Sequence, residues 1–224
     1  MSINPYNGPL MVRAYRRVAI AAFLCTAAFT MAMANKSAPL IPPAKALQLL
    51  LEGNQRYVSN RAERPNQRPS GSPQHPLAVI LSCSDSRVPP EIIFDQGVGN
   101  LFIVRVAGNT YDLLALQSIE YAVGHLGTTL ILVVGHDQCG AVTAALKAYP
   151  DPSAGPMLTN IYPAVREARG QHGDELSNAI DHNAIIISRK LGHEPELAAK
   201  VKRGQLRILP VRYILQTGVV KLLK

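Results

Sequence analysis

Aromatic side chains are scarce in this 224-residue chain, which has no tryptophan, four phenylalanines and eight tyrosines. No motif interleaves them with basic side chains, as a base-stacking platform for nucleic acid requires. The formal net charge of +8 is not a nucleic-acid signal either, because Arg13, Arg16 and Arg17 lie in a leading segment without acidic residues. The rest of the chain carries about +5, spread without a dense basic run. We therefore expect no nucleic-acid partner.

The sequence also lacks internal repeats, low-complexity tracts and a glycine-rich loop of the kind that cradles phosphate groups. Its length suits one sizeable hydrophobic core and is too short for two full domains. We expect a single domain over residues 35–224, with an N-terminal arm over about 35–76.

The first 34 residues have the pattern of a secretory signal peptide. A basic stretch precedes a run of nearly all apolar or small residues from Val18 to Met33, and Ala32-Met33-Ala34 matches an A-x-A cleavage site. One alternative is an uncleaved membrane anchor, although the run is slightly short for the hydrocarbon core of a bilayer, and another is a wrongly assigned start of the chain. We expect cleavage after Ala34 and a periplasmic or secreted mature protein. It should have no stable membrane partner unless the segment stays uncleaved.

Cysteine is scarce as well. Of the three cysteines, Cys25 lies in the signal segment, so the mature chain keeps only Cys83 and Cys139. Two cysteines in an oxidising compartment would by default form a disulfide. A non-catalytic secreted protein stapled by that disulfide is therefore one hypothesis, and the residues around the two cysteines indicate another.

Hydrophobic patterning predicts alternating strands and helices. Continuous apolar runs, typical of strands buried on both faces of a parallel sheet, occupy 77–82, 101–108 and 128–135. Segments with helical spacing occupy 44–58, 112–127, 141–149 and most of 158–203, and a predicted strand pair, 206–215 and 218–223, closes the chain. One apolar helix face is predicted from Leu113, Leu116, Ile119, Val123 and Leu126. We expect an α/β fold, with a mainly parallel central sheet flanked by helices and an N-terminal helical arm.

Metal-ligating residue types follow two of these strands. Cys83 comes directly after the first strand, in "CSDSRV", while His136 follows the third strand in "GHDQCG", which also contains Cys139. Ligands of open parallel sheets bind beyond the carboxyl ends of the strands, so we expect the two clusters to meet at one sheet edge. Two thiolates and an imidazole suit tetrahedral Zn²⁺, with the fourth position taken by water or by Asp85.

Arg87 is placed to form a bidentate ion pair with Asp85. Asp85 held in this way is not free to bind a metal, which leaves the fourth position to water. A metal-bound water has a pKa near neutrality and supplies a hydroxide nucleophile. Each of these residues taken singly has an ordinary structural explanation, and their convergence at two strand ends is what predicts a zinc enzyme. The other five histidines show no comparable spacing.

The segments "AVILSCSDSRVPPEIIFDQGVGNLFIVRVAGN" and "LILVVGHDQCGAV" resemble the two motif regions of the β-class carbonic anhydrases nearly end to end. "ALQLLLEGNQRYV" is similar to that family's N-terminal helix, so the resemblance covers roughly residues 44–224. It implies a Zn²⁺ ion held by Cys83, His136 and Cys139, with an Asp-Arg dyad at Asp85 and Arg87. In some family members the aspartate binds zinc in a closed, inactive state, so Asp85 is also an alternative ligand.

The resemblance further implies reversible hydration of CO₂ to bicarbonate and a proton, a dimer or tetramer, and N-terminal helices that wrap the partner subunit. Gln96 falls in the region where family members place a substrate-side amide. Some relatives of this fold hydrolyse carbonyl sulfide or carbon disulfide, and residue types at the metal do not separate these reactions. We expect a carbonate dehydratase, with such a hydrolase and the disulfide-stapled protein as alternatives.

Overall fold

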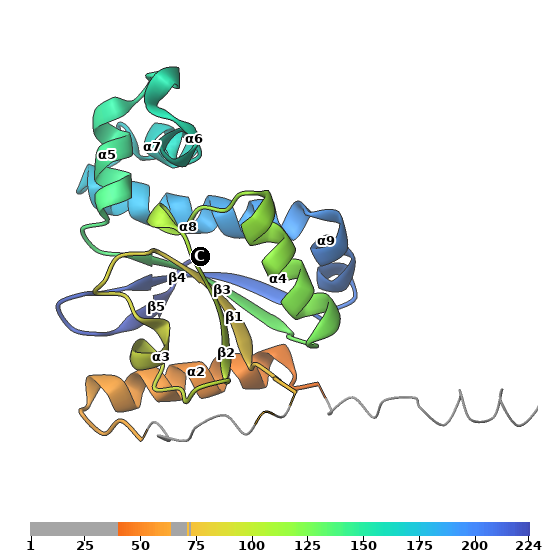
Figure 1. Cartoon of the computed structure of the whole chain (residues 1–224). Helices are drawn as coiled ribbons and strands as arrows, with labels where there is room; N and C mark the ends of the chain where they lie inside the picture. The colour runs from red at the N-terminus through yellow and green to blue at the C-terminus, as the bar shows by residue number, and fades with distance from the viewer. Residues whose placement is uncertain (1–39, 64–70, 72) are drawn as a thin grey trace, which may run out of the picture. The chain divides into compact units, whose positions relative to one another are not determined.

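Within the residues described by the computed structural model, 40–63, 71 and 73–224, five strands form one sheet in the order β2-β1-β3-β4-β5 (Figure 1). The strands are β1 (Ala78–Ser82), β2 (Leu101–Arg105), β3 (Leu130–His136), β4 (Arg207–Tyr213) and β5 (Val220–Leu222). β1 pairs in parallel with β2 and β3, β3 pairs in parallel with β4, and β5 is antiparallel to β4. The predicted α/β fold with a mainly parallel sheet is confirmed.

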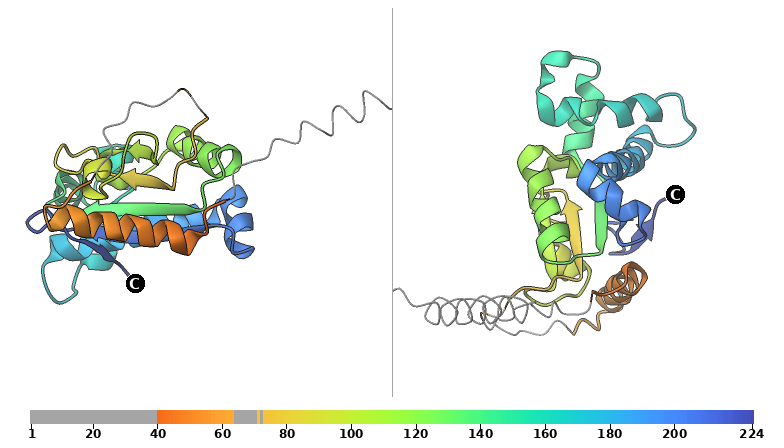
Figure 2. Two further views of the ribbon diagram at one scale, coloured as in Figure 1. Left: turned by 90° about the horizontal axis from the view of Figure 1, so that it is seen from below. Right: turned by 90° about the vertical axis from the view of Figure 1, so that its right-hand side faces the viewer.

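Helices cover both faces of this sheet (Figures 1 and 2). They are α2 (Pro43–Val58), α3 (Pro90–Ile93), α4 (Leu113–His125), α5 (Gly140–Ala148), α6 (Pro156–Thr159), α7 (Tyr162–Ala168), α8 (Glu175–His193) and α9 (Pro195–Lys202). Short 3-10 turns, η1 (Ala107–Asn109) and η2 (Pro152–Ala154), lie between them. None of the helices in the described part of the chain is long and apolar enough to cross a membrane. The predicted signal segment, 1–34, lies outside the described residues.

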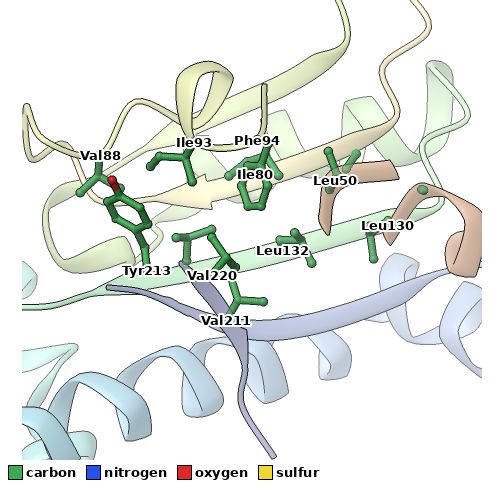
Figure 3. Packing of buried hydrophobic residues seen from close by; sticks show 13 residues of the cluster. Leu50, Ile80, Val88, Ile93, Phe94, Leu130, Leu132, Val211, Tyr213 and Val220 are labelled. Atoms are coloured by element: carbon green, nitrogen blue, oxygen red, sulfur yellow. The ribbon is translucent and has the colours of Figure 1, made fainter. Parts of the chain in front are cut away.

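Side chains that alternate along the central strands divide the core between the two faces of the sheet. On one face, Ile80 of β1 packs in a cluster with Leu50 of α2 and Leu132 of β3 (Figure 3). On the other face, Leu81 packs in a cluster that includes residues of α4 and α8, such as Ile187. Because both faces are covered, these strands consist of continuous apolar runs, which is why they were predictable from the sequence.

Two predictions from the patterning were wrong. The second strand ends at Arg105 rather than continuing to residue 108, because the chain turns into η1, where Gly108 has a φ of 70°. Leu113 was predicted on the apolar face of α4 but is 67% exposed. At about 100° per residue, Leu113 lies roughly 120° around the helix from the buried Ile119. The sequence reading also missed the single turn α3.

Gly53 and Asn54, two adjacent residues of α2, pack this helix against α3 and the segment that forms β5 of the same chain. The buried amide nitrogen of Asn54 donates to the carbonyls of Ile93 (3.0 Å) and Gly218 (2.8 Å), and its oxygen accepts from the N–H of Val220 (2.9 Å). Gly53 allows the close approach, because a Cβ there would lie 1.9 Å from the carbonyl oxygen of Phe94. The wrapping of a partner subunit by the N-terminal helices stays a prediction.

Replacing Asn54 with Ala should lower the free energy of unfolding by about 2–4 kcal/mol, since it leaves three buried backbone groups without their partners. Urea unfolding measures the change. The neighbouring Gln55→Ala is the control, because Gln55 lies on the exposed side of the same helix. A loss for Asn54→Ala no greater than that of the control would contradict the role given to this amide.

Candidate metal centre

The sheet order brings the two sequence clusters together. The chain passes from β1 to the edge strand β2 and then returns to the opposite side of β1 to form β3, so β1 and β3 are neighbours. Open parallel sheets bind ligands where the connections diverge in this way, beyond the carboxyl ends of the strands. Cys83 directly follows β1, His136 is the last residue of β3, and Cys139 is the N-cap residue of α5.

Three side chains converge at this point. The ligand atoms of Cys83, His136 and Cys139 all lie within 4.8 Å of one another, and the two sulfurs are 4.0 Å apart. All three residues are at least 95% buried. Both cysteines are free thiols, so the structure does not favour the disulfide-stapled alternative.

His136 presents one ring nitrogen to the cluster as an acceptor. Its Nδ1 lies 2.9 Å from the backbone carbonyl of Asp137, and since a carbonyl only accepts, Nδ1 carries the proton. Nε2 therefore carries the lone pair. That atom is buried and has no hydrogen-bond partner within the described residues. A buried polar atom without a partner is costly, and a metal ion would satisfy it.

A hydrogen bond links the side chains of Cys83 and Cys139. The bond from Cys139 lowers the pKa of Cys83, and the same bond together with burial raises the pKa of Cys139. The backbone N–H of Gly108 also donates to the Cys83 sulfur, at 3.3 Å. The positive φ of Gly108 favours glycine at this position, and a Cβ there would also lie 2.7 Å from the Ile161 side chain and 3.1 Å from the Ala141 side chain.

The donor set fits zinc. Two thiolates and one imidazole are the soft and borderline ligands that zinc takes in proteins, leaving one position open. Tetrahedral bonds of about 2.3 Å to each sulfur place the sulfurs about 3.8 Å apart, close to the 4.0 Å found here. Cys139 also caps the N-terminus of α5, where the helix dipole favours a thiolate.

Asp85 and Arg87 lie beside this group as a bidentate ion pair. Nε of Arg87 donates to Oδ1 of Asp85 at 3.0 Å, and Nη2 donates to Oδ2 at 2.8 Å. Asp85 is not a member of the three-residue group, since both of its oxygens face the guanidinium. Arg87 holds the pKa of the Asp85 carboxyl well below its ordinary value, so this side chain stays ionised and only accepts hydrogen bonds. Metal binding by Asp85 in a closed state stays a prediction.

The lowered pKa of Asp85 predicts how the ion pair contributes to stability across pH. The folded-state pKa lies below the unfolded value of about 3.9, so the contribution is complete above about pH 5 and is lost as the pH falls toward the folded-state pKa. The difference in unfolding free energy between wild type and Asp85→Asn should be constant from about pH 5 to 8 and should shrink below about pH 4. Urea titrations over this range measure it. A difference that grows on acidification would contradict the pairing.

Arg105 is a site residue that the sequence reading missed. Its Nε donates to the carbonyl of Cys83 (3.1 Å) and its Nη2 donates to the carbonyl of Asp85 (2.6 Å). It therefore holds the backbone that carries both a predicted ligand and the ion pair. A signal was present, because Arg105 is the one charged residue in the apolar run 101–108.

Gln96 lies in the turn between α3 and β2. Its side chain is buried, with Nε2 donating to the carbonyl of Phe94 (2.9 Å) and Oε1 accepting from Asn100 (3.3 Å). The amide is thus engaged within its own turn, and its substrate-side role stays a prediction.

The chain matches known proteins over most of its length. The family model described as "Carbonic anhydrase" matches residues 78–220. Carbonic anhydrase 2 of Mycobacterium tuberculosis is 38% identical over 193 residues, which cover 80% of this chain and 92% of that protein. The carbonic anhydrase of Mycolicibacterium smegmatis is 49% identical over 111 residues, which cover 47% of this chain and 54% of that protein.

Solved structures resemble it as well. The beta-carbonic anhydrase CcaA matches with a TM-score of 0.60 and 28% identity, over 78% of this chain and 86% of that chain. The Coccomyxa beta-carbonic anhydrase, solved in complex with acetazolamide, matches with a TM-score of 0.58 and 28% identity, over 80% of this chain and 82% of that chain.

Proposed function

The chain belongs to the β-carbonic anhydrase family, and from that premise we propose that it performs the family's reaction with a Zn²⁺ ion held by Cys83, His136 and Cys139. The reaction is the reversible hydration of CO₂ to bicarbonate and a proton, and the enzyme is a carbonate dehydratase. The observation that supports zinc most directly is the convergence of two buried sulfurs and a buried imidazole nitrogen that lacks any other partner among the described residues.

The protein's own side chains divide the work of catalysis. When bound, zinc acts as a Lewis acid that lowers the pKa of a water molecule toward neutrality. Asp85, kept ionised by Arg87, would accept a hydrogen bond from the O–H of the attacking water. That bond would point a lone pair of the water oxygen toward the substrate. Arg105 holds the backbone that sets the position of Asp85.

The surroundings of the sulfurs suit a small apolar substrate. Cys83 and Cys139 belong to one buried cluster with Val142, Ile161 and Ile180. These side chains keep water away from the buried side of the site, and CO₂ is neutral and needs few polar anchors. Hydrolysis of carbonyl sulfide or carbon disulfide on the same scaffold is not favoured by the family match.

An assay of substrate preference tests this function. Purified protein of known zinc content is given CO₂, carbonyl sulfide and carbon disulfide in parallel, with proton release and sulfide release as the readouts. We expect about one zinc per chain and rapid CO₂ hydration. Sulfide release without CO₂ hydration would reject the proposed function in favour of the hydrolase.

We also propose that the enzyme self-associates as a dimer or tetramer. β2 is an edge strand, and its four apolar residues, 101–104, are only partly buried. Leu113 and Leu114 are 67% and 72% exposed. An apolar sheet edge of this kind is typical of an interface. Sedimentation equilibrium should give the mass of two or four chains, and a monomer at micromolar concentration would contradict the proposal.

Export to the periplasm or the exterior is a further proposal, supported by the basic, apolar and A-x-A pattern of residues 1–34. N-terminal sequencing of the protein made by its native cell should begin at Asn35. A mature chain that still begins at Met1 would contradict cleavage.

A further inference from the structure

Arg212 of β4 lies at the centre of a polar network that includes Asp137, the residue that follows His136. Its guanidinium is mostly buried, with 14% of the side chain exposed. Nε donates to Oδ1 of Asp137 at 2.7 Å, and Nη2 lies 2.6 Å from the same oxygen. Nη1 contacts α8 instead, donating to Oγ of Ser177 at 2.6 Å and to Oδ1 of Asp181 at 3.1 Å. One side chain thus joins β4, α8 and the residue that follows β3.

Asp137 is held on two sides by β4. Its carboxylate accepts from Arg212, and its backbone N–H donates to the carbonyl of Tyr213 at 3.2 Å. The strand register places Gly135 opposite Arg212 and His136 opposite Tyr213, so the contacts continue the β3–β4 ladder one residue beyond the strand. The peptide unit after His136 is therefore fixed by the neighbouring strand.

The carbonyl of Asp137 accepts the hydrogen bond from Nδ1 of His136. This bond determines which ring nitrogen carries the proton and the direction in which Nε2 points. If the carboxylate of Asp137 were released, residue 137 would keep only its backbone N–H bond to β4, on the side of the residue away from its carbonyl. The carbonyl, and with it the imidazole ring, would then be free to reorient.

We propose that Arg212 is a positioning residue for the metal centre, acting through Asp137 to hold the carbonyl that orients His136. The inference rests on the proposed zinc site. A guanidinium suits this role because its planar fork reaches Asp137 and α8 at the same time, which the single ammonium of lysine does not do. Within the described residues, the Arg212 guanidinium donates to Asp137, Ser177 and Asp181 and to none of the three ligands, so it acts on the ligands through Asp137.

The alternative is that Arg212 only joins β4 to α8. Its two sets of contacts allow a direct comparison of the roles. Asp181→Asn weakens the contact to α8 and leaves Asp137 paired, while Arg212→Met removes both contacts and retains an unbranched stem. Asp137→Ala removes the contact on the metal side alone and serves as the deciding variant if Arg212→Met does not fold.

Zinc affinity, measured by competition with a chromophoric chelator, tests the proposal. Arg212→Met and Asp137→Ala should bind zinc about 10–100-fold more weakly than wild type, and Asp181→Asn should stay within about twofold. Arg212→Lys should recover part of the loss. Wild-type affinity in both Arg212→Met and Asp137→Ala, or an equal loss in Asp181→Asn, would overturn the proposal.

A second readout follows the histidine itself. In zinc-loaded protein labelled with ¹⁵N-histidine, the wild-type spectrum should show His136 protonated at Nδ1 with slow exchange of that proton. Faster exchange in Arg212→Met and Asp137→Ala, but not in Asp181→Asn, would support the positioning role, and unchanged exchange would overturn it. A wild-type protein that binds no zinc would instead contradict the proposed function, and the inference would fall with it.

Discussion

Replacing Cys83 with Ser is expected to abolish zinc binding and to lower CO₂ hydration by at least about 10³-fold. The hydroxyl of serine does not ionise at working pH, so the site would lose one of its two thiolates and keep only one thiolate and an imidazole as ligands. It would also lose the sulfur that accepts from the N–H of Gly108. Metal analysis after gel filtration and stopped-flow hydration measure the two losses.

The neighbouring Ser82→Ala is the matched control for this change. Ser82 is the last residue of β1 and is fully buried, and its hydroxyl has no hydrogen-bond partner within the described residues. Removing that hydroxyl should leave zinc content and rate near wild type. Full zinc content in Cys83→Ser, or an equal loss in Ser82→Ala, would show that the sulfur is not a ligand.

Replacing Asp85 with Asn should separate metal binding from catalysis. Asp85 is not part of the three-residue group, so zinc content should match wild type. The rate of hydration should fall by about 100-fold or more, because an amide no longer provides two acceptor oxygens fixed by Arg87. Stopped-flow rates at saturating CO₂, normalised to bound zinc, measure the effect.

Asp151→Asn is the control for the loss of one acidic charge, since Asp151 is exposed and, within the described residues, its carboxylate accepts hydrogen bonds only from its neighbour Ser153. Its zinc content and rate should both match wild type. If Asp85→Asn lost zinc in proportion to activity, Asp85 would be a ligand in the resting enzyme and the closed state would be the dominant one.

Most of the fold was predictable because burial on two faces produces continuous apolar runs. β1 and β3 followed from such runs, and α8 lies within the predicted helical stretch 158–203, with Ile180, Ala184, Ile187 and Leu191 buried along it. The failures were local. Leu113 was assigned to the apolar face for its apolar character, although its angular position lies away from the buried residues of α4, and a single turn such as α3 is too short to give a periodic pattern.

The ligand set was predictable for a topological reason, since residues that follow parallel strands gather at one edge of the sheet. The residues that support these ligands, Arg105 and Arg212, were not predictable in this way. Arg105 contacts Asp85 across 20 positions in the sequence, and Arg212 contacts Asp137 across 75. Such pairings depend on which strands become neighbours, and a single sequence does not state the strand order.

The central claim is that hydration of CO₂ depends on a zinc ion held by Cys83, His136 and Cys139. The most direct test is to follow stopped-flow CO₂ hydration while zinc is removed by a chelator and then restored. We expect the rate to fall in proportion to the zinc removed and to return with about one equivalent per chain. A rate that stays unchanged in protein shown to be free of zinc would contradict the claim.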